Sequence, residues 1–321
     1  MVKRLTKLEL KGIVQYDNKE NYLLMPNEVI EMLVKDEELN KKKAPHVAFA
    51  YTYLYMITWL YRYAKYGVMS FEDVTKSAIL KMMGIAETSS EYNYIVKKGG
   101  VLDRLGLTAT LSYTEAPINW WTNEEDSHGF PEFTYFYELE ETIKQMILNG
   151  QTTKRRQFKE PLLATGYRNP LNEEEGEEAY NGTFYEGGKE YTHLVGFDVF
   201  LECITNPSLG FVAFYLYAFI KVRMGANTEV SISLEGITKY SGILPTTRDK
   251  YLKELKGFGL IRSLPENYCL ERGGYHTEPS TYWVKEATEW LSVPNYNFPK
   301  RNVYHVSKHV DYVESSMEIT A

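Results

Sequence analysis

Two long apolar stretches, residues 47–61 and 211–222, each stand at the start of a similar order of elements. Each is shorter than the roughly 20 apolar residues that a bilayer span needs, and each contains tyrosine. We therefore expect two buried core helices, over residues 47–66 and 211–224, and no contact with a membrane. The recurrence predicts that the chain contains two units of one structural type.

The sequence that follows the second apolar stretch predicts a regular series of short elements. β-Branched and small residues at 229–232 indicate a strand. Ser233 then precedes a helical pattern that ends at Gly242, as expected for an N-cap residue and a C-terminal glycine. Pro245 marks the turn that separates this helix from the next.

The next predicted helix begins at Thr246 or Thr247, either of which is suited to cap it. Its apolar positions fall on one face, and the segment 257–261 ends it with two glycines. A strand, a glycine-rich turn at 271–274 and a returning strand follow. The apolar stripe of this helix consists of Tyr251, Leu252 and Leu255.

The first unit has the same order with short insertions. Ser70 is its candidate N-cap for residues 71–74, and Thr88, Ser89 or Ser90 is placed to cap the third helix. Gly99-Gly100 falls inside that helix and is expected to end or kink it. Strands over 108–136 and a short helix over 139–148 complete the unit.

Changes in composition divide the chain into five parts. A basic run at 154–159 and an acidic, glycine-containing stretch at 173–190 indicate a linker between the units, and two prolines near the end indicate an extended tail. The expected parts are an N-terminal segment (1–45), the first unit (46–150), the linker (151–195), the second unit (196–292) and the tail (293–321).

The order helix, strand, capped helix, turn, capped helix and hairpin resembles that of winged helix-turn-helix DNA-binding proteins. Residues 246–261 resemble the recognition helix of that family and its exit. Two such units in one chain resemble theta-type plasmid and phage replication initiators. The resemblance implies a mainly helical α+β fold with two winged helix-turn-helix domains in tandem.

In the initiator family the two domains bind successive major grooves of repeated origin sequences, and dimers often regulate their own promoter. The resemblance therefore implies a sequence-specific protein whose main partner is double-stranded DNA with repeated or palindromic sites. A cytoplasmic location is expected because the N-terminus is charged and no apolar signal core follows it. A homodimer and host replication proteins are further candidate partners.

The charge of the chain as a whole does not favour DNA binding, but the charge of one segment does. The net charge is −7, which argues against a protein that coats nucleic acid by bulk charge. Residues 210–265, however, hold eight basic side chains against four acidic ones. We expect Arg248, Lys250 and Lys253 on the face opposite the apolar stripe, where cations reach phosphates and arginine can read guanine.

The candidate DNA contacts therefore come from three places. In the first unit and in the basic run, an ordinary solvated surface explains the same residues equally well. The candidates are Thr246, Thr247, Arg248, Lys250, Lys253 and Lys256 in the second unit, Ser89, Ser90, Tyr92, Asn93, Lys97 and Lys98 in the first, and Lys154, Arg155 and Arg156 between them.

Signals of catalysis or of a cofactor are lacking, so we expect a protein that is not an enzyme and needs no metal. Gly187-Gly188-Lys189-Glu190 lacks the spacing and the hydroxyl of a phosphate-binding loop. Cys203 is expected to be a buried apolar residue, and His305 and His309 could share a metal only if they were helical. The tyrosines near the start of the first unit are expected to pack in the core.

Three other functions remain open. A transcriptional regulator of the same architecture would use the same residues. A protein-binding adaptor, such as a helicase loader, is favoured by the acidity and by an aromatic content of 14%. An enzyme is the weakest alternative.

Overall fold

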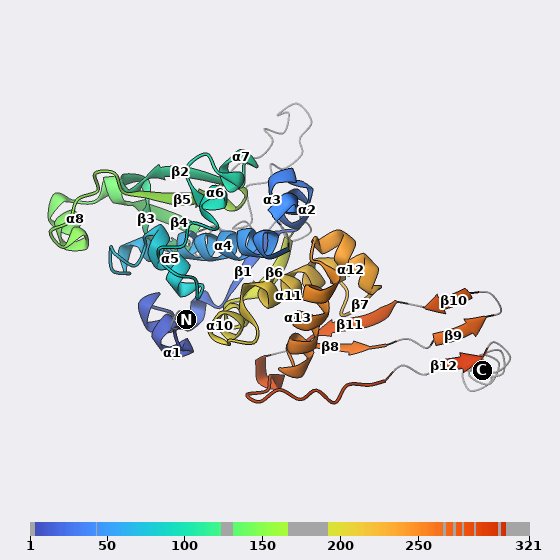
Figure 1. Ribbon diagram of the computed structural model, residues 1–321. Coiled ribbons are helices and arrows are strands. Elements are labelled where there is room, and N and C mark those ends of the chain that lie inside the picture. The colour runs from blue at the N-terminus through green and yellow to red at the C-terminus, as the bar shows by residue number, and fades with distance from the viewer. Residues whose placement is uncertain are drawn as a thin grey trace, which may run out of the picture.

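The computed structural model describes residues 4–42, 44–122, 131–165, 192–265, 268–271, 274–277, 279–285, 287–300 and 303–305. Over these residues the protein is a mixture of helices and small sheets of two or three strands, which confirms the expected α+β class. Two long helices, α4 (Ala44–Arg62) and α11 (Gly210–Met224), pack against each other near the middle of the molecule (Figure 1).

We call the part of the structure up to residue 165 the first half and the part from residue 192 the second half. The N-terminal segment contacts elements of both halves. Thr6 and Glu9 form a capping box that starts the first helix. The strand that follows pairs antiparallel with a strand of the second half, with Tyr22 opposite Gly196. The elements before α4 are α1 (Lys7–Ile13), β1 (Tyr22–Pro26), α2 (Glu28–Lys35) and α3 (Glu37–Lys42), and the partner of β1 is β6 (Thr192–Gly196).

After α4 the chain forms short helices and then two antiparallel strand pairs. One pair joins β2 (Thr108–Ser112) to β5 (Gln157–Pro161), and β3 and β4 form the other pair between them in sequence. The remaining elements of this half are α5 (Lys76–Met82), α6 (Asn93–Val96), α7 (Val101–Arg104), β3 (Pro117–Thr122), β4 (Pro131–Tyr135), α8 (Glu141–Leu148) and α9 (Leu162–Thr165).

The second half has a different order of elements, with a strand directly after its long helix. After β6 come α10 (Phe197–Thr205) and α11, and then a strand, two helices and further strands. A sheet in the order β7-β11-β8 is antiparallel throughout, and a second sheet has the order β10-β9-β12. These elements are β7 (Val230–Ile232), α12 (Leu234–Ser241), α13 (Pro245–Gly257), β8 (Ile261–Leu264), β9 (Tyr268–Glu271), β10 (Gly274–Thr277), β11 (Ser280–Val284) and β12 (Val303–His305).

One hydrophobic core runs through both halves. Helices α4 and α11 are apolar on nearly all sides, as expected for helices buried on every face. The prediction that the tyrosines of the first unit are core residues is confirmed, and so is the burial of Cys203. These buried tyrosines are Tyr51, Tyr53, Tyr55, Tyr61 and Tyr63. No helix among the described residues is both long and apolar enough to cross a bilayer.

The two predicted boundaries of α12 are confirmed, whereas the cap predicted for α13 is wrong: that helix begins at Pro245, before Thr246 and Thr247, and has no side-chain cap. The side chain of Ser233 caps α12 by accepting a hydrogen bond of 2.9 Å from the Gly236 amide. Gly242 ends the helix in the left-handed conformation with φ of 69°. In the other half, the predicted helix over 139–148 is confirmed as α8.

Two cap predictions in the first half are wrong. Residues 71–74 form turns, and the helix begins later, where Thr75 accepts a hydrogen bond of 3.2 Å from the Ala78 amide. Neither Ser89 nor Ser90 caps α6, because that helix begins at Asn93 and has no side-chain cap. For α5 the sequence predicted a hydroxyl cap of the right kind at the wrong position, and for α6 it predicted a cap that does not form.

The expected linker contributes strands to both halves. It provides β5, which pairs with β2, and β6, which pairs with β1. The acidic stretch at 173–190 lies outside the described residues. The segment after β11 contains a short 3₁₀ helix, Ala287–Glu289, and then runs without regular structure through residue 300 before β12.

Candidate nucleic-acid interface

Helix α13 presents a polar face to solvent. Pro245 occupies its first turn, where a missing amide hydrogen costs nothing. Leu252 and Leu255 point into the core, whereas Lys250 and Lys253 are exposed on the opposite side. Thr246 is also exposed and Thr247 is half-buried. The expected separation of an apolar stripe from a polar face is therefore confirmed for these residues.

Arg248 does not lie on that exposed face, and this expectation is wrong. Its side chain is only 7% exposed and lies between α12 and α13. The guanidinium donates hydrogen bonds of 2.6 Å to the Leu234 carbonyl and 2.7 Å to the Thr238 hydroxyl, and it pairs with Asp249. Since its donors are engaged within the protein, Arg248 fixes the angle between the two helices and is not available to read a base.

The turn between α12 and α13 is anchored to the central helix. The Tyr215 hydroxyl on α11 donates a hydrogen bond of 2.8 Å to the Ser241 carbonyl. The Ser241 hydroxyl accepts one of 3.2 Å from the Ile243 amide. Both Tyr215 and Ser241 are fully buried, so α13 is held at a fixed position relative to the core.

The segment after β11 covers the C-terminal end of α13. The Asn295 amide donates a hydrogen bond of 2.8 Å to the Gly257 carbonyl, and the Tyr296 hydroxyl donates one of 2.8 Å to Glu254. Gly257 leaves room for this contact, because a Cβ there would come within 2.7 Å of the Tyr296 ring. We call residues 290–300 the C-terminal strap.

The C-terminal strap also contacts two of the predicted DNA-binding lysines. The Lys253 ammonium lies 4.8 Å from the centre of the Tyr296 ring, and the Lys256 ammonium lies 4.7 Å from the centre of the Phe298 ring. Partial burial lowers the pKa of Lys256. The N-terminal half of α13 is therefore its more open part. The sequence predicted an extended tail but gave no signal that it packs on this helix.

In the first half, Gly99 and Gly100 end the third helix early, as predicted. Helix α6 stops at Val96, and α7 begins directly after Gly100. Gly99 has a φ of 67°, and a Cβ on Gly100 would lie 2.5 Å from the Tyr94 carbonyl oxygen. The result is two single-turn helices in place of one long helix.

The candidate DNA-binding residues of the first half differ in their exposure to solvent. Lys97 and Lys98 are exposed after α6, and Ser90 is exposed before it, whereas Ser89 and Asn93 are half-buried. Asn93 accepts a hydrogen bond of 2.6 Å from Lys76.

Tyr92 is a core residue, and its expected exposure is wrong. It is 7% exposed and stacks on Phe49 with 4.1 Å between ring centres.

The basic run lies between α8 and β5, in a different part of the molecule from α13 (Figure 1). Lys154 and Arg155 are exposed. Arg156 is half-buried, with its guanidinium 5.2 Å from the centre of the Phe71 ring and 3.3 Å from the Gln151 side-chain oxygen. Two of the three cations are thus open to solvent.

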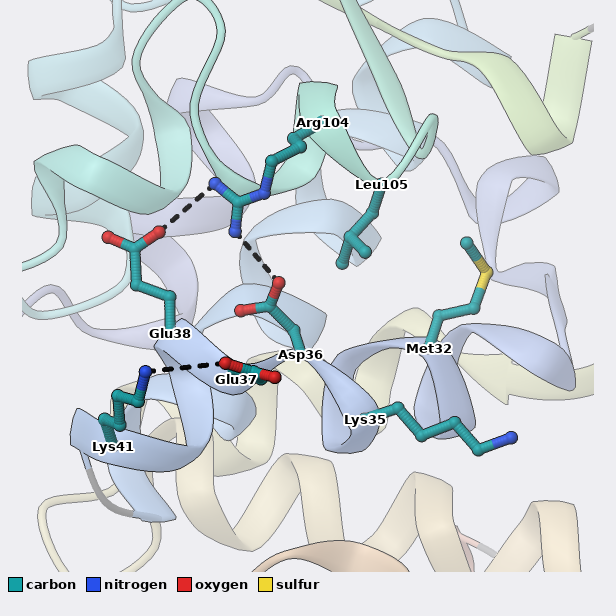
Figure 2. Close-up of a pocket in the computed structure, with 8 residues that line it drawn as sticks. All are labelled: Met32, Lys35, Asp36, Glu37, Glu38, Lys41, Arg104 and Leu105. Atoms are coloured by element: carbon teal, nitrogen blue, oxygen red, sulfur yellow. Dashed lines mark hydrogen bonds and ion pairs between the residues drawn. The ribbon is translucent and has the colours of Figure 1, made fainter.

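A shallow cavity of about 520 Å³ lies between α2, α3 and α7. Figure 2 shows the Arg104 guanidinium reaching two carboxylates, at 2.9 Å from Asp36 and 3.1 Å from Glu38. Lys41 faces Glu37 at 3.5 Å on the same side. Acidic and basic side chains therefore balance each other, and the cavity has no surplus positive charge that would attract a nucleic acid. The ion pairs of Arg104 hold α7 against α2 and α3.

No metal site is formed by the described residues: no group of three or more His, Cys, Asp or Glu side chains there is placed to hold an ion. The helix that would bring His305 and His309 together is not formed at His305, whose backbone belongs to β12. His309 lies outside the described residues.

Comparisons with known proteins found no match: no family, no curated protein and no solved structure resembles this chain closely enough to be identified.

Proposed function

We propose that this protein binds double-stranded DNA in a sequence-specific manner, as a replication initiator of a plasmid or phage. The observation that carries the proposal is the exposed polar and basic face in the N-terminal half of α13, with Thr246 and Lys250. A helix with such a face can enter the major groove, where threonine contacts base edges and lysine contacts phosphates.

The order of elements supports this use of α13. Helix α11, β7, α12, α13, β8 and β11 follow each other, and the three strands form a sheet in the order β7-β11-β8. We interpret these elements as a winged helix-turn-helix domain, in which α13 would be the recognition helix and the hairpin β9–β10 the wing. In the first half, the hairpin β3–β4 likewise lies in sequence between two paired strands, β2 and β5, but no third strand joins that pair.

The two halves would then contact DNA together. Because α4 packs on α11 and β1 pairs with β6, the halves would present their DNA-binding surfaces at a fixed spacing. We also propose that the protein forms homodimers and binds host replication proteins. A transcriptional regulator would bind in the same way and differ only in what the site controls.

One observation favours an adaptor that binds protein. Helix α8 and the residues before it expose large apolar side chains: Met146 is 75% exposed, Tyr137 56% and Ile143 43%. Exposed apolar groups that lie together indicate a surface for a protein partner.

A gel-shift assay at two salt concentrations tests the proposal. The probes are the DNA that flanks this gene and an unrelated duplex of equal length. Preferential binding to the flanking DNA, with an affinity that falls steeply with salt, is the expected result. If neither duplex binds at low salt, DNA binding is excluded and the adaptor becomes the better proposal.

A further inference from the structure

A second cavity, of about 180 Å³, lies in the first half between α4, α5, α6 and the strand pair β2–β5. Its walls are largely apolar and are formed by buried side chains such as Ile57, Ile79 and Phe158. Four lysines also line it: Lys76, Lys97, Lys98 and Lys159. A cavity with an apolar wall and several cations is suited to an organic anion.

Only one of these lysines is neutralised by a carboxylate. Lys159 is buried and pairs with Asp103, which also accepts hydrogen bonds from Thr108, Thr110 and the Gly99 amide. Among the described residues, no ion pair joins Lys76, Lys97 or Lys98 to an acidic side chain. The Asp103 carboxylate is fully engaged, so the cavity keeps a surplus of positive charge.

Two buried tyrosines supply a second, independent observation. Tyr53 and Tyr66 line the cavity and are 2% and 1% exposed. Neither hydroxyl forms a hydrogen bond with any residue in the described part of the chain. Because both side chains line the cavity, their hydroxyls are free to bond to a polar occupant there.

The groups that line the cavity determine the chemistry of that occupant. Lysine ammonium groups are donors only, and a tyrosine hydroxyl without a partner can donate as well. The occupant must therefore offer several acceptors and negative charge, which a phosphate group does. The apolar wall and the volume leave room for a small organic part beside the phosphate.

We propose that this cavity binds the phosphate group of a compact organic phosphate, with Lys97 and Lys98 at its mouth and Tyr53 and Tyr66 inside. The proposal does not depend on the proposed DNA binding. The same phosphate chemistry could come from a free metabolite or from a phosphate of the DNA backbone, and the experiment separates these two sources.

The experiment is isothermal titration calorimetry of the full chain with inorganic phosphate, with adenosine monophosphate and with a short duplex. Saturable binding of one of the two free phosphates identifies a metabolite site. Saturable binding of the duplex alone, lost in the cavity variants described below, identifies the source as a DNA phosphate. Absence of saturable binding by all three probes overturns the proposal.

Three variants test the location of the site. Tyr53→Phe removes only a hydroxyl, and Lys97→Ala with Lys98→Ala removes two exposed cations, so both should fold; each should weaken binding about tenfold. The matched control is Lys81→Ala, on the same half of the molecule but paired with Glu87 outside the cavity, and it should leave binding unchanged. Equal affinities in all variants would show that the ligand binds elsewhere and would overturn the assignment.

The experiments distinguish ligand binding in the cavity from duplex binding by α13. Variants of Lys250 should affect duplex binding and leave binding of adenosine monophosphate unchanged. If the duplex fails to bind while the mononucleotide still binds, the proposed function fails and the cavity site stands. If Lys97→Ala with Lys98→Ala leaves mononucleotide binding unchanged, the cavity assignment fails whatever the duplex does.

Discussion

The hydroxyl of Tyr51 on α4 donates a hydrogen bond of 2.6 Å to Nε2 of His193 on β6. The direction of this bond follows from the other ring nitrogen: the side-chain oxygen of Asn27 can only accept, so Nδ1 of His193 donates to it at 3.1 Å and leaves Nε2 as the acceptor. The histidine is buried and joins elements from both halves of the chain. Burial, with a smaller effect of Lys221, lowers its pKa from 6.5 to about 3.

The first prediction follows from this pKa. Between pH 6.5 and 3 the unfolded chain binds a proton that folded His193 does not, so its contribution to stability is complete above pH 6.5 and declines as the pH falls. The expected loss from this residue is about 1.4 kcal/mol per pH unit. Urea unfolding of the wild type and of His193→Gln at pH 7, 6 and 5 measures it.

The pH dependence should be shallower in His193→Gln, because glutamine does not titrate. Tyr51→Phe is the control: it removes the hydrogen bond but keeps the histidine, and should retain the steeper slope. Identical slopes in the wild type and in His193→Gln would contradict the assignment.

The second prediction concerns Arg248, which holds α12 to α13. Arg248→Met should lower the free energy of unfolding by about 1–3 kcal/mol, because the Leu234 carbonyl loses its buried donor. Lys239→Met, on the exposed side of α12, should change it by less than about 0.5 kcal/mol. Urea denaturation checks both values, and an unchanged stability of Arg248→Met would be incompatible with a structural role.

The third prediction concerns DNA binding by Lys250, which lies in the part of α13 that the C-terminal strap leaves open. Lys250→Ala should weaken binding to every duplex and reduce the salt slope by about 1, since one phosphate contact is lost. Lys41→Ala removes an equally exposed lysine on α3 and should have no effect. Binding titrations at several salt concentrations measure the slopes. A loss confined to one sequence would indicate base reading in place of a phosphate contact.

The fourth prediction concerns Gly257 and the C-terminal strap. Alanine at this helical position should favour the helix by up to about 1 kcal/mol, but its Cβ would collide with the Tyr296 ring. Gly257→Ala should therefore destabilise the wild type and stabilise the Tyr296→Ala variant. A double-mutant cycle of unfolding free energies tests this reversal of sign. Additive effects would mean that Tyr296 does not pack on α13 in solution.

The sequence predicted the second half better than the first, for a physical reason. Ser233 and Gly242 act through their own backbone neighbourhood, so their effect is visible without tertiary contacts, whereas Pro245 was assigned to the turn and is the first residue of α13. In the first half, insertions moved the helix start from Ser70 to Thr75 and left α6 without a side-chain cap. A short polar segment there has several residues that could serve as caps, and packing selects among them.

Side-chain exposure on α13 was predicted correctly for Lys250 and Lys253, which are exposed, and for the leucines of the apolar stripe. Leu252 and Leu255 are buried as the periodicity indicates. Arg248 and Tyr92 are also buried, because long side chains can turn from a boundary position into the protein when partners are present there. The Thr238 hydroxyl and the Phe49 ring supply those partners.

The sequence by itself determined the α+β class, the two core helices, the turn between α12 and α13 and the polar face of the latter. These depend on periodicity and on local backbone preferences. The tertiary structure decided the pairing of β1 with β6, the position of the C-terminal strap on α13 and the lysine-lined cavity. Each of these brings together residues far apart in the chain, and such contacts depend on how complementary surfaces meet after the helices have formed.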